Sequence, residues 1–189
     1  MLQNQFGFRT SHSTIEQVHR ITDVIEKAFE EKNVCSAVFL DVAQAFDKVW
    51  HEGLLHKLRC QLPKSFCDFL TSFLSERYFR VKLQDSYSEL KPIFAGVPQG
   101  SILGPILYLL YTSDIPTSPN YLMATFADDT AILTTNKSAK DSNEALQSAL
   151  DSINTWTKKW RIKLNHQKSV HVVFTTMQIP ADYNLYLMV

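Results

Sequence analysis

The stretch TFADDTAIL, residues 125–133, places two adjacent aspartates, Asp128 and Asp129, inside a segment that is otherwise apolar and rich in β-forming residues. Removing a carboxylate from water is costly, and two neighbouring carboxylates also repel each other. The runs 121–127 and 130–135 predict two strands separated by two residues, as in a β-hairpin. The aspartates are therefore expected in the turn, at the surface end of a buried ribbon.

A third aspartate follows another apolar strand. The run VCSAVFL, residues 34–40, has the length of one buried strand and stops at Asp41. If the strands are neighbours, three carboxylates meet at one edge of a sheet. Two Mg²⁺ ions about 3.5–4 Å apart would offset their repulsion and could stabilise the oxygens of a phosphoryl transfer. A turn or cap aspartate after a strand, and a solvated Asp-Asp pair in a loop, are the ordinary alternatives.

The rest of the chain alternates helical and extended patterns. Helical spacing or capping residues mark the segments 12–32, 63–77, 101–111 and 138–160. Extended patterns mark a hairpin over 78–95, with its turn at 85–86, and a last strand over 169–176. This mixed order favours the α+β class, with an antiparallel sheet backed by helices.

The composition predicts one soluble globular domain over residues 1–189, because 45% of the residues are hydrophobic and 20% are charged. The longest apolar run, 102–111, is too short to span a bilayer, so no membrane partner is expected. Three cysteines without a CxxC pair indicate neither a disulfide framework nor a zinc site, and an intracellular location, cytoplasm or nucleus, is expected. The zero net charge argues mildly against simple electrostatic binding of nucleic acid.

Five segments, in this order, resemble the motifs of reverse transcriptases. They are QFGFRTSHSTIEQVHR (5–20), FLDVAQAFDKVWH (39–51), GVPQGSILGPILY (96–108), TFADDTAIL (125–133) and WRIKLNHQKS (160–169). The first resembles a segment peculiar to the enzymes of non-long-terminal-repeat (LINE-type) retrotransposons, especially jockey-like ones. The resemblance covers almost the whole chain and implies the palm of a right-hand polymerase that acts as an RNA-directed DNA polymerase.

The resemblance also implies a catalytic metal site. Asp41, Asp128 and Asp129 match the family's catalytic carboxylates, which would bind two Mg²⁺ ions, with Mn²⁺ as the alternative metal. Val42 would offer its backbone carbonyl to the metal that carries the nucleotide. The ions and carboxylates would lower the barrier to nucleotidyl transfer by charge placement.

Further residues match positions that hold the nucleotide. Phe46 would be the aromatic gate that excludes a ribose 2′-hydroxyl, although a core phenylalanine gives the same pattern. Gln99 would pack near the incoming nucleotide, and Gly100 would permit close backbone approach or a positive φ. Lys168 would meet the pyrophosphate leaving group, with a solvated lysine as the alternative. Asp47 is expected to pair or cap locally.

The expected partners are an RNA template, a DNA primer and deoxynucleoside triphosphates. Compared with the family, most of the fingers, the thumb and the endonuclease segment are absent from this sequence. We therefore expect a palm-centred domain, incomplete at both ends, that acts within a longer polyprotein. The alternative is a catalytically inactive remnant of a transposable element with at most weak nucleic-acid binding. An RNA-directed RNA polymerase is disfavoured by Phe46 and by the segment 5–20.

Overall fold

The computed structural model describes residues 4–178, and the chain divides into two compact units. The first, here called the sheet unit, contains the chain up to Ala43 and again from Asp114. The second, the insert unit, is Gln44–Ser113. No helix within residues 4–178 is both long enough and apolar enough to cross a membrane. The expected extent of a single domain, residues 1–189, stays a prediction.

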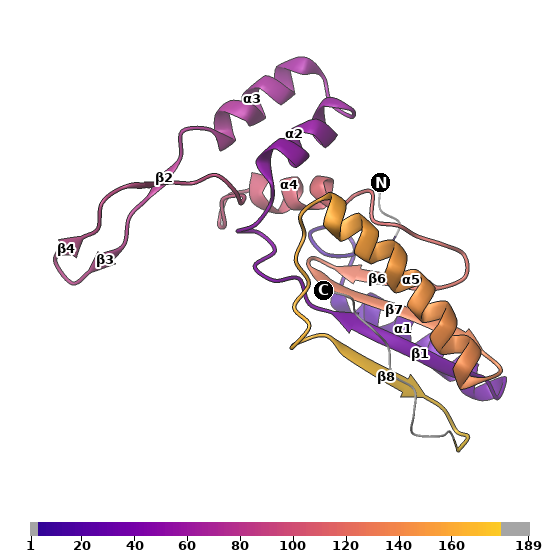
Figure 1. The fold of residues 1–189 in the computed structure, drawn as a ribbon. Coiled ribbons are helices and arrows are strands. Elements are labelled where there is room, and N and C mark those ends of the chain that lie inside the picture. Colours follow the sequence, from indigo (N-terminus) through magenta and orange to yellow (C-terminus); the bar gives the residue numbers. More distant parts are fainter. Residues whose placement is uncertain (1–3, 179–189) are drawn as a thin grey trace. The chain divides into compact units, whose positions relative to one another are not determined.

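The sheet unit is built on four antiparallel strands in the order β6-β7-β1-β8 (Figure 1). Their bounds are β1 (Val34–Leu40), β6 (Leu122–Phe126), β7 (Asp129–Asn136) and β8 (Val170–Phe174). Strand β1 lies between β7 and β8, and all but one of its residues are buried. The strands expected from the sequence are therefore present, and the buried run 34–40 has the expected bounds.

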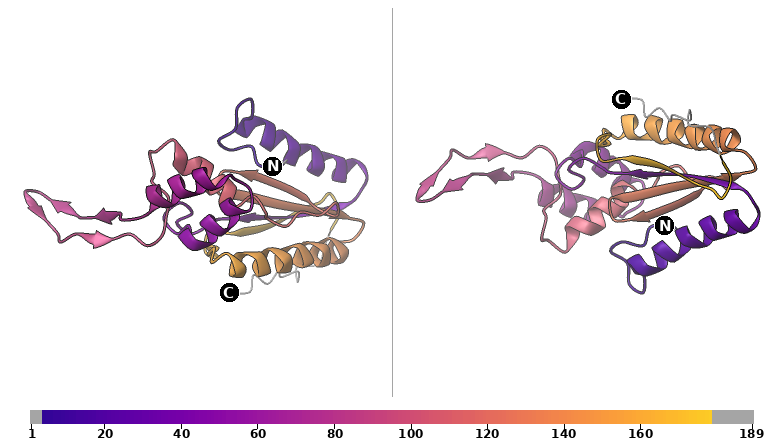
Figure 2. Two further views of the ribbon diagram at one scale, coloured as in Figure 1. Left: turned by 90° about the horizontal axis from the view of Figure 1, so that it is seen from above. Right: turned by 90° about the horizontal axis from the view of Figure 1, so that it is seen from below.

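Two helices cover opposite faces of this sheet, as both views in Figure 2 show. They are α1 (Thr14–Glu30) and α5 (Ala139–Lys159). The expected capping box is present at the start of α1, because Ser13 and Glu16 each accept a hydrogen bond from the other's backbone N–H. Ser138 caps α5 through one hydrogen bond, since its hydroxyl accepts from the Asp141 backbone N–H.

Each face of the sheet has its own apolar core, which makes three layers. The α5 side is formed by Val38, Leu40, Met123, Ile132, Leu146, Ala149, Leu150 and Ile153. The α1 side is formed by Ala28, Cys35, Ala37, Ala124, Ala131 and Leu133. Burial of these side chains is the main favourable term that holds the layers together. The expected fold class, an antiparallel sheet backed by helices, is confirmed.

The insert unit contains three helices and a long two-stranded arm (Figure 1). The helices are α2 (His51–Arg59), α3 (Lys64–Leu74) and α4 (Leu103–Tyr111). The arm runs out through β2 (Tyr78–Phe79) and β3 (Lys82–Leu83) and returns through β4 (Ser86–Tyr87) and β5 (Lys91–Pro92). Helix α2 packs against both α3 and α4, and the ammonium group of buried Lys57 donates to the Tyr111 carbonyl.

Two expected turn positions were wrong, and one helix was not predicted. Both hairpin turns lie one residue earlier than expected, at Ala127–Asp128 and at Gln84–Asp85, because Asp129 pairs with Phe126 and Ser86 pairs with Leu83. Ala127 and Gln84 have φ values of 58° and 52°. Alanine and glutamine rarely adopt this left-handed region, so the residue preferences of turns do not predict either position. Helix α2 was not expected, because no side chain caps it at Trp50 and Gly53 weakens its helical pattern.

Candidate active site

Asp41 and Asp129 lie opposite each other at one end of the sheet. The last β1–β7 pair joins Leu40 to Thr130, so the residue after Leu40 faces the residue before Thr130. Asp128 is in the turn that joins β6 to β7, directly before Asp129. Because β1 and β7 are antiparallel, the end of one strand and the beginning of the other bring all three aspartates to the same edge.

The three aspartates give this edge of the sheet a concentration of negative charge. The pKa of Asp129 is raised above its ordinary value, first by desolvation and then by the charges of Asp128 and Asp41. Although much of Asp129 is exposed, it borders an apolar pocket, which accounts for the desolvation of its carboxyl. The carboxylates of Asp128 and Asp41 therefore both disfavour the charged form of Asp129.

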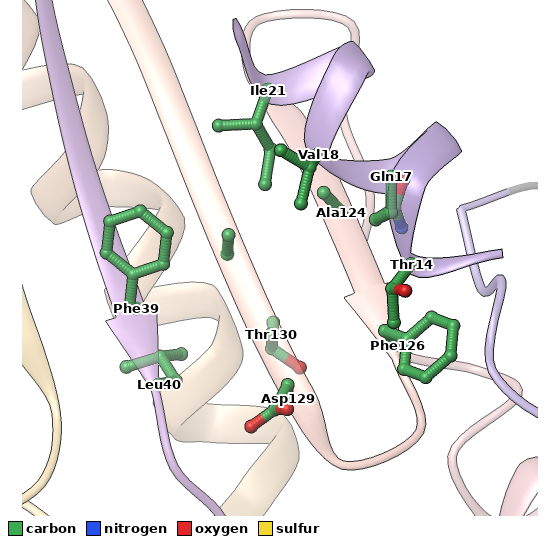
Figure 3. A pocket seen from close by; sticks show the side chains of 11 residues that line it. Thr14, Gln17, Val18, Ile21, Phe39, Leu40, Ala124, Phe126, Asp129 and Thr130 are labelled. Atoms are coloured by element: carbon green, nitrogen blue, oxygen red, sulfur yellow. The ribbon is translucent and has the colours of Figure 1, made fainter.

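The pocket beside Asp129 has a volume of about 300 Å³ and lies between α1 and the sheet (Figure 3). Val18 and Ile21 line it from α1, and Phe39, Phe126 and Asp129 line it from the strands. In Figure 3, Asp129 is at the end of this lining nearest the β6–β7 turn.

The raised pKa predicts a stability effect with a definite sign. Folding favours protonated Asp129, so the contribution is fully present below the ordinary pKa of 3.8 and is lost as the pH rises through the folded-state value. Asp129→Asn removes the charge, so we expect the metal-free variant to melt about 1–2 °C higher at pH 7, with the gain shrinking toward pH 4. Thermal unfolding followed by circular dichroism between pH 4 and 8 measures it. A gain that grows as the pH falls would contradict the assignment.

The donor chemistry of this edge fits a hard divalent cation, because such ions take carboxylate oxygens. Within residues 4–178, however, no three His, Cys, Asp or Glu side chains lie in an arrangement that could hold a metal ion. Gathering the three aspartates on one ion therefore requires movement of their side chains. An ion would favour that movement because its positive charge offsets both the desolvation of Asp129 and the repulsion from Asp128 and Asp41, which together raise the pKa of Asp129.

The backbone of Asp41 is held by the segment that follows α5. Its N–H donates to the Ser169 hydroxyl at 3.2 Å, and its carbonyl accepts from the Asn165 N–H at 2.8 Å. The Ser169 hydroxyl in turn donates to the Asn165 carbonyl at 2.9 Å. Sequence reasoning missed both contacts, although Ser169 directly follows Lys168 in a motif that it singled out.

Val42 is the next residue along this edge and forms an isolated antiparallel bridge with Leu164. The hydrogen bonds of the bridge come from the neighbours of Val42, since the Asp41 carbonyl accepts from Asn165 and the Ala43 N–H donates to Lys163. The bridge therefore does not use the Val42 carbonyl, the group expected to contact a metal. Lys168 has an exposed side chain.

Phe46 lies in the insert unit, where its half-buried ring stacks on Tyr108 with the ring centroids 4.8 Å apart. Gln99 and Asp47 are both exposed and are joined by a hydrogen bond of 3.0 Å from the Gln99 amide to an Asp47 carboxylate oxygen. Asp47 therefore pairs with a residue 52 positions away in the chain, whereas a local partner was expected. Gly100 has a φ of 80°, and a Cβ there would meet nothing within 4 Å. Glycine is therefore favoured at this position by the backbone conformation and not by a lack of space.

The loop that carries Gln99 is fastened to the turn that carries Phe46. The Val97 N–H donates to the Phe46 carbonyl, and the Gly96 N–H donates to the Val49 carbonyl, both at 2.8 Å. Gly96 has a φ of 91°, and a Cβ there would lie 2.7 Å from the carbonyl oxygen of Asp47. The later part of the motif 39–51, from Gln44 on, and the motif 96–108 thus meet inside the insert unit, while the aspartates, Val42 and Lys168 belong to the sheet unit. That Phe46, Gln99 and Gly100 share a site with the aspartates stays a prediction.

The chain matches the family described as reverse transcriptase (RNA-dependent DNA polymerase) over residues 1–183, and it belongs to that family. Enzymes of this family generally use divalent metal ions and act on a nucleic-acid template.

Among named relatives, the chain is 44% identical over 180 residues to the probable RNA-directed DNA polymerase from transposon BS of Drosophila melanogaster. The aligned region covers 91% of this chain and 20% of the relative. The chain is also 44% identical over 178 residues to the RNA-directed DNA polymerase from mobile element jockey of the same organism, covering 90% of this chain and 19% of the relative. The chain therefore spans about a fifth of the length of these relatives. The expected kinship with non-long-terminal-repeat retrotransposon enzymes is confirmed.

Solved structures support the same fold. The apo telomerase from Candida tropicalis, truncated from its C-terminal domain, matches with a TM-score of 0.65 and 20% identity, over 90% of this chain and 36% of that one. A structure of telomerase from the same organism in complex with a fragment of telomeric RNA matches with a TM-score of 0.61 and 15% identity, over 90% of this chain and 30% of that one. At these identities the likeness concerns the polymerase fold.

Proposed function

We propose that this chain is the palm region of an RNA-directed DNA polymerase from a non-long-terminal-repeat retrotransposon. It would transfer nucleotides from deoxynucleoside triphosphates to the 3′ end of a DNA primer on an RNA template. The observation that carries the proposal is the meeting of Asp41, Asp128 and Asp129 at one edge of the sheet, in a chain of the reverse transcriptase family. The remaining parts of the enzyme would be supplied by a longer polyprotein, since the relatives are about five times as long.

Asp41, Asp128 and Asp129 would hold two Mg²⁺ ions, or Mn²⁺ in their place, and the Val42 carbonyl would complete one ligand set. When bound, such ions activate the attacking 3′-hydroxyl and stabilise the leaving oxygen. The raised pKa of Asp129 supports this role, because a divalent cation would favour the charged carboxylate, which desolvation and then repulsion from Asp128 and Asp41 disfavour. The residues of the chain would fix the positions of the ions, with Asp41 held through its backbone by Ser169 and Asn165.

Phe46 would select the sugar of the incoming nucleotide, and Gln99 and Gly100 would contact it from the loop that is fastened to the same turn. The stacking of Phe46 on Tyr108 supports the gate, because a ring held on one side is a rigid steric barrier. The open space around the Cβ position of Gly100 would let a nucleotide approach the backbone. Lys168, exposed to solvent, would neutralise the departing pyrophosphate.

A gate of this kind predicts altered sugar selection. Phe46→Val removes the ring, so we expect discrimination against ribonucleotides to fall at least about 10-fold. The measurement is single-nucleotide addition with paired deoxy- and ribonucleotides, in a chimera where this chain replaces the matching segment of the Drosophila jockey enzyme. Phe66→Val, at an exposed position of α3, is the matched control and should leave discrimination unchanged. Unaltered discrimination in active Phe46→Val would count against the gate.

The arrangement of these side chains is also compatible with a second candidate function. No three acidic, histidine or cysteine side chains in the described residues are gathered for metal binding, which is also what an inactive member of the family would show. Such a protein would fold and bind nucleic acid weakly without turnover.

The chimera distinguishes the two candidates. Synthesis of DNA on an RNA template with Mg²⁺, absent when the template is omitted, is the result expected for the polymerase. A soluble, folded chimera that binds primer–template and adds no nucleotide would instead establish the inactive form. The unmodified jockey enzyme, purified and assayed in parallel, is the positive control.

A further inference from the structure

The turn that carries Asp128 is clamped by a side chain from the other end of the chain. Gln5 is only 2% exposed. Its side-chain amide forms hydrogen bonds with both the carbonyl and the N–H of Ala127. The Gln5 Nε2 donates to the Ala127 carbonyl at 2.9 Å, and the Gln5 Oε1 accepts from the Ala127 N–H at 2.8 Å. The same Oε1 accepts from the Gly7 N–H at 2.7 Å. The side chain therefore pairs with the turn as a neighbouring peptide would.

This turn needs such support. Ala127 has a φ of 58°, in the left-handed region that non-glycine residues seldom adopt unless the surrounding structure holds them there. Ala127 directly precedes Asp128, and Phe126 pairs with Asp129 across the turn. The backbone conformation of Ala127 therefore decides the direction in which Asp128 leaves the turn and the register in which Asp129 pairs with Phe126.

The residues next to Gln5 hold the same segment against the β6–β7 turn. The Arg9 guanidinium donates to the Gln5 carbonyl at 2.8 Å, which fixes the backbone of Gln5. A Cβ at Gly7 would lie 2.2 Å from the backbone nitrogen of Ala127, so only glycine lets this segment approach the turn so closely. The Phe6 N–H donates to the Thr125 carbonyl at 2.9 Å, which anchors the segment along β6. These contacts explain the spacing of Gln, Gly and Arg in QFGFR.

We propose that Gln5 is a positioning residue for the catalytic hairpin: by holding Ala127 in the left-handed conformation, it aligns Asp128 and Asp129 for the divalent ions. The inference rests on the proposed function, because it assigns Gln5 an effect on metal use. Without the clamp the turn samples other conformations, and the ions must gather ligands that are no longer aligned. The effect falls on the metal requirement and on kcat, while the KM for the nucleotide changes little.

The test compares Gln5→Met with Gln17→Met in the jockey chimera. Methionine has nearly the length of glutamine but cannot form these hydrogen bonds. Gln17 is the matched control: it is buried, and its Nε2 donates to the carbonyls of Thr125 and Asn4, both at 2.8 Å, so its loss weakens the same segment away from the turn. For Gln5→Met we expect the half-saturating Mg²⁺ concentration to rise, and kcat to fall, by about 10-fold relative to Gln17→Met.

A second measurement does not depend on activity. In the 189-residue chain, hydrogen exchange of the Ala127 amide should accelerate at least about 10-fold in Gln5→Met, and remain near the wild-type rate in Gln17→Met. If Gln5→Met does not fold, Gln5→Asn takes its place, because it keeps the amide but is one methylene too short to reach both groups of Ala127.

The outcomes separate this inference from the proposed function. Gln5 variants whose Mg²⁺ dependence and kcat match those of Gln17→Met would overturn the positioning role, while an active wild-type chimera would leave the polymerase function standing. A wild-type chimera without activity would instead contradict the proposed function. In that case the hydrogen-exchange rate of the Ala127 amide decides whether Gln5 holds the turn. Unchanged protection of this amide in the Gln5 variant would overturn the positioning role.

Discussion

Gly7→Ala is expected to destabilise the chain by about 1–3 kcal/mol, since the added methyl group would overpack a site that has no free space. Its Cβ would lie 2.2 Å from the nitrogen and 2.8 Å from the Cα of Ala127. Both are backbone atoms, which cannot rotate away as a side chain could. The segment that begins at Asn4 must therefore withdraw from β6, and its hydrogen bonds to Thr125 must lengthen or break.

Urea unfolding followed by circular dichroism measures this loss. Thr10→Ala, at an exposed position three residues later, is the control and should change stability by less than about 0.5 kcal/mol. Equal stabilities of the two variants would show that the segment does not approach the β6–β7 turn as closely as described.

Asp128→Asn is expected to reduce primer extension by the jockey chimera at least about 100-fold, the range seen when one preorganised electrostatic group is removed from an active site. Asparagine has nearly the same shape but no charge, so it weakens binding of divalent ions. The substitution also removes one of the charges that raise the pKa of Asp129, so it should not destabilise the fold. Loss of activity with retained stability would therefore locate the defect in the chemistry.

Asp23→Asn is the matched control for that substitution, because it removes the same charge from an exposed position on α1. It should keep activity within about 2-fold of the parent, as surface substitutions usually do. An Asp128→Asn chimera that extends primers as fast as the Asp23→Asn chimera would remove Asp128 from the catalytic site.

Local signals in the sequence were sufficient for much of the fold. The capping box at Ser13 and Glu16 fixes where α1 begins, and the uninterrupted apolar run 34–40 has the length of one buried strand. Three aspartates at strand ends were enough to predict one acidic edge. These features depend on residues that are close together in the chain, so a single sequence reveals them.

Features that depend on distant residues could not be predicted in this way. The β6–β7 turn is one residue earlier than turn chemistry indicates, because Gln5, 122 residues away, holds Ala127 in a left-handed conformation. Ser169 contacts the Asp41 backbone across 128 residues. Nothing near Ala127 or Asp41 in the sequence marks these partners, and only the folded chain brings them together.

The proposed function depends most on Asp41, Asp128 and Asp129 forming one binding site for divalent metal ions. The most direct measurement is titration of the isotope-labelled chain with Mn²⁺, whose paramagnetism broadens the amide signals of nearby residues. We expect the signals of these three aspartates to broaden together at the lowest Mn²⁺ concentrations, to be protected by excess Mg²⁺, and to stay sharp in the triple Asp→Asn variant. Early broadening at Asp128 and Asp129 without Asp41, or broadening that persists in the triple variant, would show that the three aspartates do not form one metal site.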